Sequence, residues 1–268
     1  MKNLTLVVCV VVLLLGGVSG CGSAGATSST AANAENVTMQ GGQWEYVVTP
    51  QSGIQMYFGT NLPTTNANFS ASNLVIFQPS QISLTQNSAP ISCEQYSING
   101  AIGGTEVDAK IATPTGAFAS FSGQLSADGQ SISNGKYTGQ GCTAVPSNVT
   151  GTLTGYTVAP LNGTFTGTLT SSTSGASVMT ADFEQGVAYT VKIAGTFVEN
   201  GVTTSFMDMP GTDSSLISGA SLFFGIDTVN VNGKGQYQGL GHMNPTGTQI
   251  DIYLAGGNDT IIGTLTKQ

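Results

Sequence analysis

The sequence predicts an all-β fold: a single antiparallel β-barrel or β-sandwich domain of ten or more short strands behind a flexible tether. Two observations carry this prediction. Threonine or serine alternates with apolar or aromatic residues along many short runs, and a period of two places the apolar side chains on one face of a strand. Glycine, asparagine, aspartate and proline separate the runs, as expected for turns between strands. Helical periodicity is almost absent, which favours a barrel or a sandwich.

The alternation is clearest in Thr164–Thr170, where Phe165 and Leu169 fall on one face of the strand and the threonines on the other. The other predicted strands are Gln43–Thr49, Asn73–Phe77, Gly116–Leu125, Gly135–Gly139, Gly151–Val158, Ala188–Phe197, Ser221–Val231, Gly235–Gly239, Thr248–Leu254 and Thr260–Thr266. Thr212–Ser218 is the exception, because an N-cap residue there favours a single helical turn.

The charge composition excludes one class of partner. Only 7% of the 268 residues are charged, and six lysines face fourteen acids, with no arginine, for a net charge of -8. Nucleic-acid binding depends on clustered lysine and arginine side chains. We therefore expect no nucleic-acid partner. The length is compatible with one large domain or two small ones, and all-β barrels and sandwiches of this size commonly form a single domain.

Residues 1–20 predict a lipoprotein signal peptide. After Lys2 comes an apolar run of about 12 residues, whereas a membrane-spanning helix needs about 20. The run is followed by Val18-Ser19-Gly20-Cys21, which resembles the lipobox of bacterial lipoproteins. The resemblance implies cleavage between Gly20 and Cys21 and attachment of diacylglycerol to the Cys21 thiol. The alternative is an ordinary secretory signal with an incidental cysteine.

The lipid on Cys21 would anchor the protein. Each buried methylene of an acyl chain contributes about 0.8 kcal/mol, so two or three chains hold a protein on a membrane almost permanently. Gly22 follows the cysteine, at the position where aspartate retains many Gram-negative lipoproteins in the inner membrane. The resemblance therefore implies an outer-membrane location in the cell envelope. Residues 21–42 are rich in small polar residues and predict a lipidated flexible tether before an all-β domain at 43–268.

The cysteines leave one pair for a disulfide bond. Cys9 departs with the signal peptide and Cys21 is acylated, so Cys93 and Cys142 are expected to pair in an oxidising compartment. The bond would close a loop of about 50 residues and stabilise the fold by about 4 kcal/mol. A metal or redox pair is the alternative, although no CxxC spacing or nearby histidine supports it.

Catalytic and nucleotide-binding motifs are absent from the sequence. Neither the nucleophile motif G-x-S-x-G nor the phosphate loop G-x-x-x-x-G-K-[ST] occurs. The single histidine, His242, lies in Gly239–Pro245, which we interpret as a turn between two strands. An exposed or capping histidine is the favoured interpretation over an acid–base or metal-binding one. We expect no metal and no cofactor.

Three residues are candidates for ligand binding. Trp44 and Tyr46 lie near the start of the domain, and aromatic rings exposed on a polar sheet can stack on sugars; His242 is the third candidate. The alternative places Trp44 in the core of the first strand. Gly42–Tyr46 together with Gly135–Cys142 is similar to a group of acidobacterial-type lipoproteins that have no assigned activity, so this resemblance implies no site.

The sequence therefore predicts a membrane-anchored cell-envelope lipoprotein that serves as a non-enzymatic binding or structural module. Its expected partners are membrane lipid, through acylated Cys21, and a glycan or an envelope protein. Three other functions stay open: a glycan-binding or adhesive module, a carboxylate-based hydrolase, and a carrier of apolar ligands, which requires a hollow barrel.

Replacing the lipidated cysteine tests the anchor. A Cys21→Ala variant should lose labelling by a fatty-acid analogue and leave the membrane fraction, because its thiol is the proposed attachment point. Metabolic labelling and cell fractionation measure both effects. Retention of the variant in the membrane fraction would contradict the prediction.

Overall fold

A computed structural model of the chain describes residues 36–78, 91–141, 148–208, 215–228, 235–256 and 258–268. The signal peptide, Cys21 and most of the tether lie outside these residues, as does Cys142. Ala34–Gln268 forms one compact unit. The unit is all-β and antiparallel, as predicted, and its described part contains 17 strands. No helix in this part of the chain is long and apolar enough to cross a bilayer.

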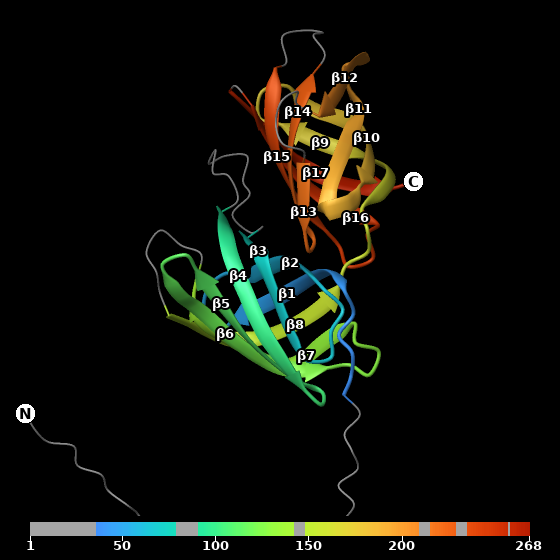
Figure 1. The fold of residues 1–268 in the computed structure, drawn as a ribbon. Helices are drawn as coiled ribbons and strands as arrows, with labels where there is room; N and C mark the ends of the chain where they lie inside the picture. Colours follow the sequence, from blue (N-terminus) through green and yellow to red (C-terminus); the bar gives the residue numbers. More distant parts are fainter. Residues whose placement is uncertain (1–35, 79–90, 142–147, 209–214, 229–234, 257) are drawn as a thin grey trace, which may run out of the picture. The chain divides into compact units, whose positions relative to one another are not determined.

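The first eight strands form a closed barrel in which each strand pairs with the next and β1 also pairs with β8 (Figure 1). The strands are β1 (Gly42–Pro50), β2 (Met56–Leu62), β3 (Asn68–Gln78), β4 (Ile91–Gly103), β5 (Glu106–Thr113), β6 (Gly116–Leu125), β7 (Ser131–Gln140) and β8 (Asn148–Thr157).

The remaining strands form a second sheet in the order β10-β9-β17-β16-β15-β14-β12-β11-β13, and a further pairing of β10 with β11 closes it. A 3-10 turn, η2 (Val187–Tyr189), connects β10 to β11. The strands are β9 (Asn162–Ser171), β10 (Gly175–Gln185), β11 (Thr190–Glu199), β12 (Val202–Asp208), β13 (Ser215–Ser218), β14 (Ser221–Thr228), β15 (Gln236–Met243), β16 (Gln249–Gly256) and β17 (Asp259–Lys267).

Each closed sheet surrounds its own apolar core. Trp44, Tyr46 and Phe58 are among the large side chains in the first core, and Phe165 and Phe197 are in the second. A barrel of about eight strands is just wide enough for side chains to fill, whereas about 16 strands leave a channel. This geometry explains why the strands divide between two barrels, whereas the sequence led us to expect a single barrel or sandwich domain. The choice between barrel and sandwich is thereby settled in favour of barrels.

Two local expectations need correction. Ser215–Ser218 is a strand rather than a helical turn, because Leu216 pairs with both β11 and β14, and this tertiary pairing overrides the local capping signal. The tether was expected to extend to residue 42. Met39 is instead fully buried in the first core and bridges to Thr65, so the last described residues of that segment are already packed against the barrel.

Both barrels pair a glycine with a buried phenylalanine on the neighbouring strand. Phe69 lies opposite Gly100 in the first barrel, and Phe224 lies opposite Gly239 in the second. A Cβ added at either glycine would overlap the ring of its partner. The aromatic ring therefore covers the space that a glycine leaves in the sheet.

A substitution at Gly100 tests this arrangement. Gly100→Ala should destabilise the fold by about 1–3 kcal/mol, because the added methyl group forces the Phe69 ring out of its position. Thermal or urea unfolding measures the change. Gly103→Ala on the same strand is the matched control, since nothing lies within 4 Å of the Cβ built there. Equal stability of the two variants would contradict the prediction.

Candidate functional site

A polar layer covers the outward face of β1 where the second barrel packs on the first. Gln43 and Glu45 alternate with the core residues Trp44 and Tyr46 and so project outward from the first barrel. They are nevertheless buried, with exposed fractions of 4% and 0%. The turn between β13 and β14, together with β15, supplies the atoms that contact them.

Glu45 is the centre of this layer. Its Oε2 accepts a hydrogen bond from the backbone N–H of Ala220 at 3.0 Å, and its Oε1 lies 3.0 Å from Nε2 of His242. The His242 side chain is only 12% exposed. Burying a carboxylate is costly unless hydrogen bonds and an opposite charge compensate it. Glu45 therefore links the two barrels through a backbone amide and an imidazole.

Further hydrogen bonds join the two barrels around Glu45. Gln43 Nε2 donates to the carbonyl oxygen of Gly219 at 2.7 Å, and Ser218 Oγ donates to the carbonyl oxygen of Gly59 at 3.0 Å. A Cβ added at Gly59 would overlap the Ser218 carbonyl group. Gly219 has a φ of +57°, and a Cβ there would overlap the backbone of Trp44. The close approach of the two barrels therefore depends on both glycines.

A small pocket of about 220 Å³ opens beside this layer; it is lined by Tyr57, Tyr156, His242, Met243, Asn244, Pro245, Gln249 and Asp251. The rings of Tyr57 and His242 meet edge to face, with centroids 4.5 Å apart. Burial, and then the charges of Glu45 and Asp251, raise the pKa of Tyr57. Burial, and then Glu45 and Tyr57, raise the pKa of Tyr156. Both phenols therefore stay protonated at neutral pH and act as hydrogen-bond donors rather than bases.

The geometry of this pocket does not favour hydrolysis. Nε2 of His242 faces Glu45. Ser221 lies opposite His242 on β14, but it is fully buried and its Oγ has no hydrogen-bond partner. A nucleophile must reach its substrate, and Ser221 cannot. The described residues also contain no group of three or more His, Cys, Asp or Glu that could hold a metal ion.

The candidate binding residues need two corrections. Trp44 and Tyr46 are fully buried in the first core and stack on each other with centroids 6.0 Å apart, so they present no surface to a sugar. The core interpretation of Trp44 is the right one. His242 lies within β15 and not in a turn, where it pairs with Asp251 of β16 as well as with Ser221.

The predicted disulfide bond is not tested by the described residues. The backbone of Cys93 lies in β4, opposite Ile76 of β3, but its side chain and the whole of Cys142 lie outside the description. The pairing of Cys93 with Cys142 stays a prediction.

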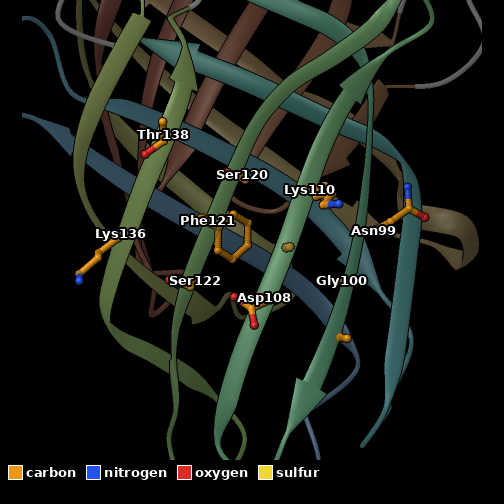
Figure 2. A pocket seen from close by; sticks show the side chains of 11 residues that line it. Asn99, Gly100, Asp108, Lys110, Ser120, Phe121, Ser122, Lys136 and Thr138 are labelled. Carbon is orange, nitrogen blue, oxygen red and sulfur yellow. The ribbon is translucent and has the colours of Figure 1, made fainter.

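A larger hollow lies on the outer surface of the first barrel, over β4–β7. It has a volume of about 600 Å³, and Figure 2 shows its lining. The outward side chains form two rows across the strands: Asn99, Lys110, Ser120 and Thr138 in one, and Ala101, Asp108, Ser122 and Lys136 in the other. We call this surface the β4–β7 face. All of these side chains are exposed except Ser122, which is half-buried.

Irregular strand pairing accompanies the hollow. The register shifts between Ser122 and Gln124 where β6 pairs with β7, and between Ile132 and Gly135 where β7 pairs with β8. Such bulges bend a strand and increase its twist. We attribute the concave outer surface to these bends, since a regular barrel is convex on its outside.

Two lysines distinguish the β4–β7 face. Lys110 and Lys136 form no ion pair with any described residue, whereas Lys192 pairs with Glu184 at 3.8 Å and Lys267 lies over the ring of Phe165. Sequence reasoning missed both lysines. The sequence did contain a signal for Lys110. Polar and apolar residues alternate in Glu106–Thr113, which places Asp108 and Lys110 on one face of a strand.

Comparisons with known proteins assign neither a family nor a function to the chain. No protein-family model and no curated protein matches the chain. Among solved structures, it is similar to the crystal structure of the isotype 1 transferrin binding protein B from serogroup B Neisseria meningitidis. The two share 9% sequence identity at a TM-score of 0.31, over 87% of this chain and 77% of that one. A likeness at this level carries no argument about function.

Substitutions at Glu45 test the polar layer. Glu45→Ala removes the acceptor of both the Ala220 N–H and the His242 imidazole and should destabilise the protein by about 3 kcal/mol. Glu45→Gln keeps one acceptor oxygen and should cost less. Urea unfolding at neutral pH measures the difference. Glu106→Ala, at an exposed position of β5, is the control. If Glu45→Ala unfolds at the same urea concentration as the unaltered protein, Glu45 does not stabilise the contact between the barrels.

Proposed function

We propose that this protein is a lipid-anchored envelope protein whose two-barrel body is a non-enzymatic binding module, with the β4–β7 face as its contact surface. One observation carries the proposal. The hollow of about 600 Å³ is open to solvent, and seven of its eleven lining residues are polar. The conspicuous polar side chains at Glu45 and His242, by contrast, hold the barrels together.

The anchor rests on the sequence. Val18–Cys21 resembles a lipobox and precedes a segment of small residues. About 20 residues of such composition span roughly 25 Å as a random coil. Lipid on Cys21 would hold the body near a membrane while leaving its outer faces accessible, and the outer membrane is the proposed location.

The alternative functions have weaker support. Hydrolysis by carboxylates at the polar layer would need an accessible pair of acids, and Glu45 is fully buried. A carrier of apolar ligands needs an empty lumen, and large side chains occupy the interior of each barrel. Glycan binding remains a candidate, although on different residues from Trp44 and Tyr46.

Photo-crosslinking in intact cells tests the contact surface. A photoreactive phenylalanine analogue at Ser120, in the middle of the β4–β7 face, should form a discrete adduct, because a bound partner lies against this strand. The same analogue at Thr203, an exposed position of β12, is the control. Adduct formation is read by a shift of the protein on a denaturing gel. Equal adducts at both positions, or none at Ser120, would overturn the proposed surface.

A further inference from the structure

We infer that the β4–β7 face binds an acidic polysaccharide, whose carboxylate groups pair with Lys110 and Lys136 and whose hydroxyl groups bind the side chains between them. This inference names the ligand class for the surface described under the proposed function and rests on it. The observation behind it is that two lysines without an ion pair among the described residues lie in one open hollow with the hydroxyl groups of Ser120, Ser122 and Thr138.

Charge argues for an anionic ligand. The chain carries a net charge of -8 and six lysines in all, yet two of these lysines lie on a single concave surface. Lys110 is on β5 and Lys136 on β7, with β6 between them (Figure 2). Two strand spacings amount to about 10 Å. The two ammonium groups are thus far enough apart to contact separate acidic groups on one extended polymer.

The residues between the lysines suit a polyhydroxylated ligand. Ser120 separates Lys110 from Thr138 in one row, and Ser122 separates Asp108 from Lys136 in the other. Serine and threonine hydroxyl groups both donate and accept hydrogen bonds, and an ionised aspartate accepts them. A sugar ring offers hydroxyl groups of both kinds. The carboxylate of Asp108 also repels an acidic group of the ligand. We therefore expect the acidic groups of the ligand at the two lysines and its hydroxyl groups at Asp108.

A protein partner fits this surface less well. Exposed large apolar side chains occur elsewhere, at Ile54, Val178, Val187, Val198, Val202, Met207 and Leu216, and none of these lies on β4–β7. Protein interfaces are centred on apolar and aromatic anchors. Nor can a peptide add as an extra strand at this face, because each of the strands β4–β7 is paired on both sides. The same surface offers no exposed aromatic ring, so recognition here depends on charge and hydrogen bonds rather than on stacking.

Binding to defined polymers tests the inference. The full-length lipidated protein in detergent micelles should bind polygalacturonate, a carboxylate-bearing polysaccharide, in biolayer interferometry. Binding should weaken as salt is added, because exposed charges are screened. Neutral dextran should bind at least tenfold more weakly, because it lacks the acidic groups. Poly-L-glutamate should also bind at least tenfold more weakly, because it lacks the hydroxyl groups.

Variants locate the binding. Lys110→Gln combined with Lys136→Gln should weaken polygalacturonate binding about tenfold, since each exposed ion pair contributes up to about 1 kcal/mol. Lys192→Gln, on the other barrel and paired with Glu184, should leave polygalacturonate binding unchanged.

Three outcomes would overturn the inference. Poly-L-glutamate could bind as tightly as polygalacturonate, which would point to an acidic polypeptide as the ligand. Dextran could bind equally tightly, or the double variant could bind polygalacturonate as the unaltered protein does. Absence of polygalacturonate binding together with a Ser120 adduct in cells would overturn the ligand class alone, whereas loss of both would overturn the proposed function as well.

Discussion

Closure of each sheet on eight strands is the constraint on which the rest of the structure depends. A ring of about eight strands has an interior that side chains can fill, and in both barrels a cluster of buried apolar residues does so. Closure also leaves the ring strands paired on both sides, which removes the edges that invite another chain to add as a strand. The places left for recognition are the outward faces of the strands, the loops and the contact between the barrels.

The outward faces of the strands are covered in one part of the molecule and exposed to solvent in another. On β1 the outward residues Gln43 and Glu45 are covered by the second barrel, and backbone and side-chain groups across the contact satisfy them. On β4–β7 the outward residues stay exposed. The same period-two alternation thus produces a polar joint in one place and an open polar surface in another. The difference lies in what covers each face.

Much of the fold could be predicted because alternation is a local signal. Thr164–Thr170 and Thr260–Thr266 lie inside β9 and β17. β5 was missed, since its outward residues Glu106, Asp108 and Lys110 are charged and its pattern differs from the threonine-rich runs. Alternation tells which side chains share a face, but not which strands pair. Alternation therefore could not predict the division into two barrels. Nor could it predict the burial of the aromatic residues on β1.

The candidate site was harder to predict. Glu45 and His242 are 197 positions apart in the sequence, and no local pattern joins residues at that separation. Lys110 and Lys136 share a surface only because β6 lies between their strands and bulges bend it. The lone histidine and the tryptophan drew attention because they are rare residue types, yet one proved to be part of a structural joint and the other part of a core.

Lysine footprinting is the most direct test of the claim that the β4–β7 face binds an anionic polymer. The full-length protein in micelles is acetylated under mild conditions with and without polygalacturonate, and mass spectrometry measures the modification of each lysine. We predict that the polymer protects Lys110 and Lys136 and leaves Lys192 and Lys267 unchanged. Equal protection of all four lysines, or no protection of Lys110 and Lys136, would contradict the account.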